Sequence, residues 1–402
     1  MVYHQVHAQI RSHPVEKMST PKRRLCIVAA TPLTIHFFFK QHIAYLCHEY
    51  DVTVVYNTSS DTYLPPLGLP VNEQCVQMER RISPYKDIVA LIQLWLFMRR
   101  VRFDMVITLV PKAGIVGMLA AFFTKVRIRV HIFQGEVWAS RSGFLRAFLR
   151  FFDVVIGRLA TNVLAVSPSE RNFLEKEGVV RPGRIQVIKK GSICGVDSDR
   201  FKPDERSRRD VRAEFEFESS DIVCIFLGRL AVDKGVYDLV RAFKQSLQAQ
   251  GKLRLLLVGP DEDALEHKIL SILGPVAGAR LTMVSYTQSP ERLLACADFH
   301  CMPSYREGFG MAIIEAASVG IPSIATRIYG VVDAIEEDVT GLLVPTGDVK
   351  RLSDAITRLA NDKELRESLG FAARNRVIKD FTQIEIIQAY KSYLDDLFRM
   401  VR

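Results

Sequence analysis

Short apolar runs alternate with longer segments of helical periodicity along most of the chain. In the first half, the apolar runs that we expect to form buried strands are 25–30, 52–56, 105–109, 128–133, 163–166 and 185–188. Between several of them, apolar residues recur every three or four positions, at 37–50, 88–100, 143–158 and 170–177. Strands that alternate with helices in this way predict a parallel sheet with helices on both faces.

A second series of the same kind follows a polar, glycine-containing stretch at 189–203, which we interpret as the connection between two domains. Its expected strands are 222–227, 253–258, 281–285, 323–325 and 341–344, and its expected helices include 291–297, 352–361, 363–379 and 383–400. A chain of 402 residues is longer than one hydrophobic core usually serves. The pattern therefore predicts two doubly wound α/β domains.

The stretch 304–315 combines a loop, two glycines and two acids. It follows an apolar run that we expect to be a strand, and it leads into a short helix that begins near Gly310. Gly308 and Gly310 let the backbone approach a ligand closely, and the free N–H groups at the helix start suit an anion such as a phosphate. Glu307 in the loop and Glu315 in the helix can each accept hydroxyl hydrogen bonds. Taken alone, the two acids fit a polyol site and ordinary surface positions equally well.

Three further loops of the second domain are predicted to lie at the same edge of the sheet, beyond the carboxyl ends of its strands. The loop 228–235 carries Arg229 and Lys234, which can clamp a diphosphate, Arg by its fork and Lys as a point charge. The other two loops supply Gly259 and Tyr286. Together with the two acids, these loops hold the parts needed to bind a nucleoside diphosphate that carries a polyol. In the first domain, the corresponding loops around one cleft mouth are 30–34, 111–114 and 134–138.

The segment 143–158 reads GFLRAFLRFFDVVIGR and has two explanations. Arg146 and Arg150 share one helix face, and large apolar residues such as Phe148 fill much of the rest. One explanation is a helix that lies on an anionic membrane surface, with Phe and Leu inserted and Arg at the head groups. The other is an ordinary domain helix that packs on the sheet with its Arg side chains in water.

The net charge of +9 is concentrated in the first half of the chain. Residues 1–200 carry 27 Lys and Arg against 15 Asp and Glu, a net of +12, whereas residues 201–402 carry 27 against 30, a net of −3. This asymmetry indicates an anionic partner for the first half, either nucleic acid or a membrane surface. A nucleic-acid-binding protein is the less favoured of the two, because the sequence contains no recognisable nucleic-acid-binding module.

Cysteine usage and the N-terminus bear on the compartment. The seven cysteines form no CxxC pair and have no histidine at metal-binding spacing, which favours buried free thiols in a reducing compartment. Residues 1–20 lack an apolar signal core, which argues against secretion, and either Met1 or Met18 can be the true start. No run of about 18 apolar residues is present. The two Asp-x-Asp clusters at 197–199 and 261–263 are interpreted as turn and helix-start features, so no metal site is expected.

Several motifs resemble those of glycosyltransferase family 4. They are VSPS at 166–169, GVDSDRF at 195–201, GRL followed by KG at 228–235, VGP at 258–260, PSYREGFG with a later Glu at 303–315, and TGLLV at 340–344. The resemblance covers roughly 22–395 and is most specific in the second domain. It implies a GT-B fold, in which two Rossmann-like domains face a central cleft and a C-terminal helix crosses back to the first. The expected parts are a flexible N-terminus at 1–21, an acceptor-binding domain at 22–200, a nucleotide-sugar-binding domain at 201–380 and the crossing helix at 381–402.

The resemblance also implies a retaining transfer of a sugar from a nucleotide sugar, usually without a metal ion or other cofactor. By matched motif, Glu315 resembles the acid that holds the donor ribose, and Glu307 resembles the acid near the donor sugar ring. Arg229 and Lys234 resemble the clamp that stabilises the leaving diphosphate, and with Glu307 they are the expected catalytic residues. The other expected donor contacts are Gly228, Gly259, Tyr286, Gly308, Phe309, Gly310 and Met311.

The first domain departs from the family pattern in two loops. Ala29-Ala30-Thr31-Pro32 stands where a Gly-Gly pair is frequent, and Gln134-Gly135 stands where His-Gly is frequent. This domain looks like the branch that builds bacterial surface polysaccharides on polyprenyl-diphosphate carriers. That implies a UDP-sugar donor, a lipid-linked saccharide acceptor and a place at the inner face of the cytoplasmic membrane. The expected acceptor contacts are Thr31, Lys112, Gln134, Gly135, Glu136 and Trp138, and a UDP-sugar epimerase of the same fold stays open as an alternative.

Overall fold

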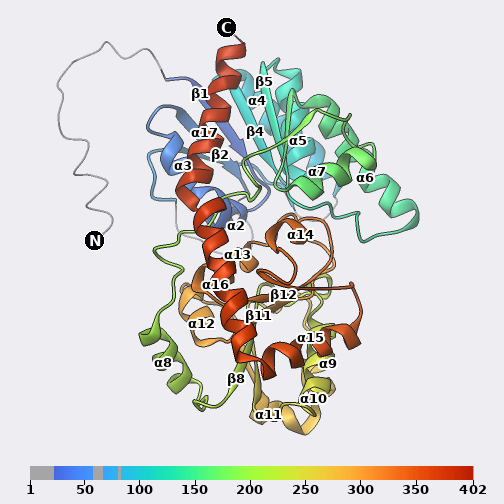
Figure 1. Cartoon of the computed structure of the whole chain (residues 1–402). Coiled ribbons are helices and arrows are strands. Elements are labelled where there is room, and N and C mark those ends of the chain that lie inside the picture. Colours follow the sequence, from blue (N-terminus) through green and yellow to red (C-terminus); the bar gives the residue numbers. More distant parts are fainter. Residues whose placement is uncertain (1–21, 58–66, 80–82, 402) are drawn as a thin grey trace, which may run out of the picture.

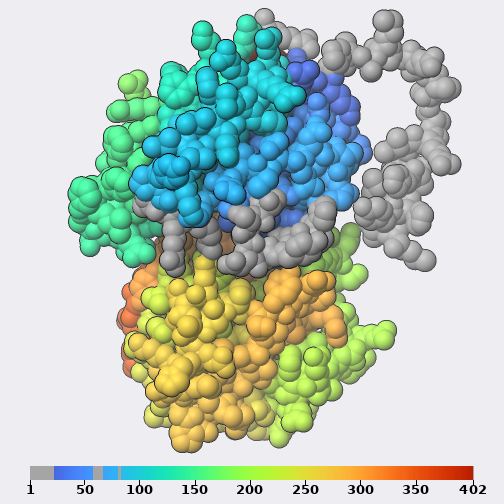
Figure 2. All heavy atoms as spheres, turned by 180° about the vertical axis from the view of Figure 1, so that it is seen from behind, coloured from blue at the N-terminus to red at the C-terminus, as the bar shows by residue number. Residues whose placement is uncertain are grey.

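The computed structural model describes residues 22–57, 67–79 and 83–401, so the expected flexible N-terminus at 1–21 lies outside the described residues. The described chain forms two lobes, one above the other (Figure 1), and Figure 2 shows the same two lobes from the opposite side. Each lobe is built on one parallel sheet. The predicted α/β architecture of two doubly wound domains is therefore confirmed.

The sheet of the first domain runs in the order β3-β2-β1-β4-β5-β6-β7. Its strands are β1 (Arg24–Val28), β2 (Asp51–Tyr56), β3 (Asn72–Cys75), β4 (Met105–Leu109), β5 (Ile128–Phe133), β6 (Asn162–Ala165) and β7 (Ile185–Val187). β4 is buried at every position because helices cover both faces of the sheet, which is why it is apolar throughout. β3 is not among the expected strands. Its sequence, Asn-Glu-Gln-Cys, is polar and mostly exposed, as an edge strand permits.

Helices form a layer on each face of this sheet. One layer contains α4 (Pro84–Val101), α5 (Pro111–Phe123) and α6 (Gly143–Leu159), and α7 (Pro168–Lys176) follows β6. The other layer contains the segment expected as one helix at 37–50. It begins earlier than expected, because Pro32 suits the first turn of a helix, and it is divided into α2 (Pro32–Thr34), a π-helical turn (Ile35–Phe39) and α3 (Lys40–Leu46).

The sheet of the second domain runs in the order β10-β9-β8-β11-β12-β13. Its strands are β8 (Ile222–Leu227), β9 (Leu253–Val258), β10 (Leu281–Val284), β11 (Phe299–Met302), β12 (Ser323–Thr326) and β13 (Gly341–Val344). Its helices are α8 (Glu205–Glu214), α9 (Val236–Ser246), α10 (Glu266–Leu273), α11 (Ala277–Arg280), α12 (Pro290–Cys296), α13 (Met311–Val319), α14 (Val331–Ala334), α15 (Val349–Asn361) and α16 (Lys363–Asp380), with 3₁₀ turns at Val232–Lys234 and Gly274–Val276.

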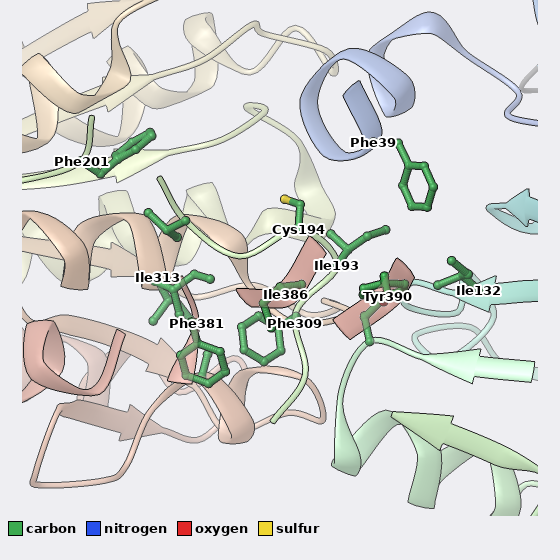
Figure 3. Close-up of a cluster of buried hydrophobic side chains, with 14 of the residues drawn as sticks. Phe39, Ile132, Ile193, Cys194, Phe201, Phe309, Ile313, Phe381, Ile386 and Tyr390 are labelled. Carbon is green, nitrogen blue, oxygen red and sulfur yellow. The ribbon is translucent and has the colours of Figure 1, made fainter. Parts of the chain in front are cut away.

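The last helix, α17 (Gln383–Met400), crosses from the second domain to the first and packs on α3 (Figure 1), as expected. The Tyr50 hydroxyl donates to Asp395, and the Tyr50 ring stacks on Phe398 with centroids 5.5 Å apart. Figure 3 shows Phe309 of the second domain beside Phe381, with Ile193, Ile386 and Tyr390 nearby. One hydrophobic core therefore runs through both domains below the cleft.

Three further observations concern the cysteines, the length of apolar helices and the clustering of possible metal ligands. All seven cysteines are free, and six are buried as expected, whereas Cys75 on the edge strand is exposed. Within the described ranges, no helix is both long enough and apolar enough to cross a bilayer. Nor do three or more His, Cys, Asp or Glu side chains of the described residues gather in a way that could hold a metal ion.

Candidate active site

The point where the second sheet reverses its strand order brings two predicted site residues, Lys234 and Glu307, together. β8 and β11 are neighbours there, and ligands of such sheets bind beyond the carboxyl ends of the two central strands. The loop after β8 places Lys234 with its Nζ 2.6 Å from Oε1 of Glu307, in the loop after β11. The Ser304 hydroxyl donates to the same carboxylate oxygen at 2.8 Å. The predicted convergence of these two loops is confirmed by this contact.

Arg229, the second cation of the predicted diphosphate clamp, also pairs with acids. Arg229 pairs with Glu262, and its Nη2 lies 4.0 Å from Oδ2 of Asp233. Arg306 donates to the same Asp233 oxygen at 3.0 Å. Burial alone would raise the pKa of Asp233, but the charges of Arg306, Lys234 and Arg229 hold it below its usual value. The loop after β8 therefore holds both of its cations, Arg229 and Lys234, in a network of ion pairs.

The backbone around these cations is tightly packed. Gly259 adopts a φ of +142°, and a Cβ there would overlap the carbonyl oxygen of Gly228. The loops after β8 and β9 can therefore lie against each other only because Gly259 has no side chain. Tyr286, in the loop after β10, is 54% exposed beside them.

The start of α13 has the geometry that the sequence predicts for this loop. The helix begins at Met311, and its N-cap is Gly310, with a φ of +84°. Among the described residues no side chain caps this end, so the first N–H groups of the helix and its positive dipole end face the loop. The Phe309 ring is buried against Phe381, with centroids 5.2 Å apart, and Met311 accepts a hydrogen bond from Ser192 through Sδ at 3.2 Å. Phe309 thus has only backbone groups to offer a ligand.

Glu315 lies farther along α13 and is half-buried. Burial raises the pKa of Glu315 to about 7, and the charge of Arg200 opposes this shift. Arg200 comes from the interdomain connection, and it donates through Nε to Glu291 at 3.0 Å and through Nη2 to the Gln288 carbonyl oxygen at 2.7 Å. The carboxyl group of Glu315 therefore gains and loses its proton near neutral pH.

The first domain contributes its loop after β5 directly to the site. Gly135 takes a φ of +88°, and a Cβ there would lie 2.8 Å from the backbone nitrogen of Gly308. Likewise, a Cβ on Gly308 would lie 2.7 Å from the carbonyl carbon of Gln134. Arg306 spans the two domains, because its Nη1 donates to the Gly135 carbonyl oxygen at 3.1 Å. Gln134 and Gly135 therefore lie against the loop that carries Glu307.

Three predicted acceptor contacts need correction. Trp138 is only 1% exposed, because its ring stacks on Phe173 and its Nε1 donates to Asp153 at 2.6 Å, so it supports the loop from within. Glu136 is also 1% exposed, so its carboxyl does not face the cleft as a surface acid. Lys112 is not a free cation, because both carboxylate oxygens of Asp87 lie 2.6 Å from its Nζ. Thr31, after β1, is half-buried, with its Oγ1 3.3 Å from Oγ1 of Thr34.

Behind the loop after β5, Glu136 belongs to a set of buried acids whose other members, Asp153 and Glu170, the sequence pattern does not single out. Burial raises the pKa of Glu136 to about 8 and that of Asp153 to about 7. Burial and the neighbouring Glu136 hold the pKa of Glu170 well above its usual value. Glu170 accepts hydrogen bonds from the backbone N–H groups of Gly135 and Val166, the latter at 2.8 Å. Glu170 thereby fixes the loop that meets Glu307.

Helix α6 packs within the first domain and also exposes apolar side chains. It packs on the sheet through Asp153, Ile156 and Gly157, which are buried. Its two predicted head-group contacts are engaged within the protein: Arg146 lies 2.8 Å from a Glu177 carboxylate oxygen, and Arg150 donates to the Glu177 carbonyl oxygen at 2.8 Å. Phe148 is half-buried, whereas the outer face exposes Phe144, Leu145 and Phe151, of which Phe144 is 84% exposed.

Sequence reasoning also misses several side chains that shape the site. Ser304 and Arg306 lie in the stretch 304–315 and Asp233 lies between Arg229 and Lys234, so their position beside the acids and cations was a usable signal. Tyr329 and Asp333, which join the two domains beside the site, carry no such signal, whereas Ser169, which Asp333 contacts, lies in the VSPS motif. Their contacts depend on how the two domains meet.

Two doubly wound domains, a cleft lined by loops from both, and a crossing C-terminal helix define the GT-B fold. Comparison with known proteins agrees with this architecture. The family model described as "Glycosyl transferase 4-like domain" matches residues 41–191, and that described as "Glycosyl transferases group 1" matches residues 207–376. The chain is a glycosyltransferase of the GT-B fold that resembles bacterial surface-polysaccharide enzymes.

Two curated relatives match most of the chain. The capsular polysaccharide biosynthesis glycosyltransferase CapM of Staphylococcus aureus is 26% identical over 325 residues, which cover 80% of this chain and 85% of the relative. The UDP-Gal:alpha-D-GlcNAc-diphosphoundecaprenol alpha-1,3-galactosyltransferase of Escherichia coli is 25% identical, over 79% of this chain and 81% of the relative.

Two solved structures show the same fold. Sucrose-phosphate synthase from Thermosynechococcus elongatus has a TM-score of 0.77 at 21% identity and covers 94% of this chain and 100% of its own. Anabaena HepE in complex with UDP and glucose has a TM-score of 0.77 at 17% identity, with 92% and 99% covered.

Proposed function

We propose that this chain is a retaining glycosyltransferase that moves a sugar, a hexose or an N-acetylhexosamine, from a UDP-sugar to a polyprenyl-diphosphate-linked saccharide in the synthesis of a cell-surface polysaccharide. The observation that carries the proposal is the contact between Lys234 and Glu307, 2.6 Å long, next to the uncapped start of α13. It joins a diphosphate-binding cation, a sugar-binding acid and an anion-binding helix end in one place. The printed name of the Escherichia coli relative supports a UDP-sugar donor and a lipid-diphosphate acceptor.

Each part of the donor has a matching group. Glu315, in the middle of α13, is the proposed acceptor of the ribose hydroxyl hydrogen bonds. Arg229, Lys234 and the N–H groups of Gly310 and Met311 are the proposed diphosphate contacts. Glu307 would then hold hydroxyl groups of the sugar ring, because its backbone lies against Gly135 of the first domain, where the two domains meet.

The proposed reaction exchanges one bond at the anomeric carbon for another on the same face. The bond from this carbon to the diphosphate oxygen breaks, and a bond to the acceptor hydroxyl oxygen forms. The acceptor proton passes to the departing phosphate oxygen, and UDP leaves. Lys234, Arg229 and the dipole of α13 would stabilise the negative charge that develops on the diphosphate, so we propose that the transfer needs no metal ion.

An anionic membrane surface is the proposed place of the lipid-linked acceptor. The layer of α4, α5 and α6 exposes Tyr85, Ile88, Ile92 and Leu96, spaced three or four residues apart on α4, with Phe122 and Phe123 at the end of α5. Together with Phe144, Leu145 and Phe151 of α6, these side chains form the outer apolar surface of the layer. Exposed cations at Arg99, Arg100, Lys125 and Arg158 accompany it, which suits anionic head groups. α6 lies at the outer edge of the upper lobe (Figure 1).

The test is a panel of nucleotide sugars in an equilibrium binding assay, followed by product analysis with and without a polyprenyl-diphosphate saccharide. We expect one UDP-sugar to bind, and Lys234→Ala and Glu315→Ala to weaken its binding. Consumption of the UDP-sugar should require the acceptor. Conversion of the UDP-sugar to an isomer without acceptor would instead identify an epimerase, and binding of no nucleotide sugar would refute the proposal.

A further inference from the structure

A group of contacts outside the proposed donor site joins the two domains beside it. Tyr329 lies in the second domain, between β12 and α14. Its ring stacks on Phe173 of α7 in the first domain, with centroids 4.4 Å apart and planes at 14°. Its hydroxyl oxygen accepts a hydrogen bond from the backbone N–H of Glu136 at 3.2 Å. Because Phe173 also stacks on Trp138, Tyr329 extends an aromatic stack that belongs to the first domain.

A second contact lies one turn farther along the chain. Oδ2 of Asp333 accepts the backbone N–H of Ser169, at 2.8 Å, and also the Ser169 hydroxyl. The same hydroxyl oxygen accepts the backbone N–H of Gly330 at 2.6 Å. Arg376 of α16 holds this segment from the other side, because it donates to the Asp333 carbonyl oxygen at 2.7 Å. One serine at the start of α7 is thus bound at three points to the loop and helix after β12.

Three glycines connect these contacts to the loop that carries Glu307, because Gly330 and Gly135 both pack against Gly308. A Cβ on Gly330 would lie 2.5 Å from the carbonyl oxygen of Gly308, and a Cβ on Gly135 would lie 2.8 Å from the Gly308 nitrogen. Gly308 is therefore packed between the segment bound to Ser169 and the first-domain loop. Arg306, which donates to the Gly135 carbonyl oxygen, adds a hydrogen bond to the same junction.

We infer that Ser169, Tyr329 and Asp333 are positioning residues, which form an interdomain latch that holds the Glu307–Gly308 loop against Gln134–Glu136. The inference rests on the proposed function, because it assigns the latch to the sugar end of that site. The proposed nucleotide contacts, Arg229, Lys234 and Glu315, all belong to the second domain. The sugar end lies where the domains meet, so the latch should govern the rate of transfer rather than the affinity for the nucleotide.

Loss of the latch should leave the fold intact. The domains are also joined by α17, through Tyr50 with Asp395 and through Lys391, whose Nζ lies 2.9 Å from a Glu49 carboxylate oxygen. The connection between the domains is fixed as well, because Val196 and the start of α17 exchange backbone hydrogen bonds. The interdomain core in Figure 3 is built from other side chains, among them Phe309, Ile386 and Tyr390. Variants of the latch are therefore expected to fold.

The test compares Asp333→Ala and Ser169→Ala with Asp348→Ala. Asp348 is the matched control, because it also accepts a backbone N–H, from Arg351 at 2.9 Å, but caps α15 within the second domain. We expect the two latch variants to lower kcat about tenfold with the donor KM within about twofold, and the control to change neither. The double variant should be no slower than the single ones, since both remove the same contact, and Ser169→Thr should keep the wild-type rate.

A second measurement separates this inference from the proposed function. Hydrogen exchange of the free protein should become faster at 134–136 and 307–310 in Asp333→Ala, and not in Asp348→Ala. If the wild-type protein transfers no sugar, the proposed function fails, and the exchange data still decide whether the latch exists. Unchanged exchange, or faster exchange with an unchanged kcat, overturns the positioning role. So does a loss of activity that only follows a loss of folded protein.

Discussion

Nζ of Lys234 lies 2.6 Å from Oε1 of Glu307, although 73 positions separate the two residues in the sequence. One follows β8 and the other follows β11, so the strand order of the sheet brings them together. The pair is shielded, with 17% and 14% of the two side chains exposed. In the proposed function, this ion pair opens when a sugar diphosphate binds. Lys234 then contacts the phosphates, and Glu307 contacts the sugar.

The first prediction concerns Lys234. Lys234→Ala should lower kcat/KM by about 10²–10³, the usual effect of removing one group that stabilises developing negative charge. Steady-state rates with the UDP-sugar and acceptor measure it. Lys350→Ala is the control, because Lys350 lies 77% exposed on α15 and pairs only locally, with Asp354. Equal activity of Lys234→Ala and wild type would remove Lys234 from the proposed clamp.

The second prediction concerns the pH dependence of donor binding. Burial raises the pKa of Glu315 to about 7. Its carboxylate accepts ribose hydroxyl hydrogen bonds best when ionised, so affinity for the UDP-sugar should rise about tenfold between pH 6 and pH 8. The phosphates of a UDP-sugar do not titrate in this range. Calorimetry at both pH values measures the effect. In Glu315→Gln the dependence should disappear, and a variant that keeps the wild-type pH dependence would contradict the assignment.

The third prediction concerns stability. The pKa of Glu136 is raised to about 8 by burial and then by Asp153, and burial raises the pKa of Asp153 to about 7. Between pH 5 and pH 8 the folded chain therefore holds protons that the unfolded chain has released. These two acids make the free energy of unfolding fall as the pH rises, by at most about 1.4 kcal/mol per pH unit for each group. The buried His42, His131 and His300, whose pKa values burial lowers, act in the opposite direction below about pH 6.5, so the contribution of the acids is measured by comparing variants.

Urea unfolding at several pH values measures this slope. In Glu136→Gln the free energy of unfolding should fall less with rising pH than in the wild-type protein, because the variant lacks one of the buried acids that hold a proton. Glu367→Gln, at a side chain that is 67% exposed on α16, should leave the slope unchanged. The same pH dependence in Glu136→Gln and in the wild-type protein would show that Glu136 is ionised in the folded chain.

The fourth prediction concerns the membrane surface. Because Arg146 and Arg150 are engaged by Glu177, the decisive side chains are the exposed apolar ones of α6. The triple change Phe144→Ser, Leu145→Ser and Phe151→Ser should reduce cosedimentation with anionic vesicles on the order of tenfold, with UDP-sugar binding unchanged. Phe371→Ser is the matched control, since Phe371 is 70% exposed on α16 of the other domain. Equal losses in both variants would argue against a membrane face on α6.

Much of the fold follows from local pattern. β4 and β8 are apolar runs because helices bury both of their faces, and such runs mark parallel strands. The meeting of Lys234 and Glu307 also follows, because the loops of a doubly wound sheet gather at one edge. β3 could not be predicted in this way, because an edge strand needs no apolar face.

The parts that the sequence does not reveal depend on contacts between distant segments. Trp138 lies in a loop sequence that suits a binding surface, and only its contact with Asp153 and Phe173 places it inside. Lys112 is neutralised by a residue of a different helix, Asp87. Ser169 and Asp333 are 164 positions apart and in different domains. Nothing local in the sequence encodes that pairing, because it arises from the packing of one domain on the other.

The central claim is tested most directly by following a radiolabelled sugar from the UDP-sugar that binds to a polyprenyl-diphosphate saccharide, with EDTA present. The account predicts labelled lipid product, release of UDP in equal amount and an unchanged anomeric configuration of the transferred sugar, together with a loss of about 10²–10³ in Lys234→Ala. Label that never enters the lipid fraction, or a Lys234→Ala variant as active as wild type, would contradict it.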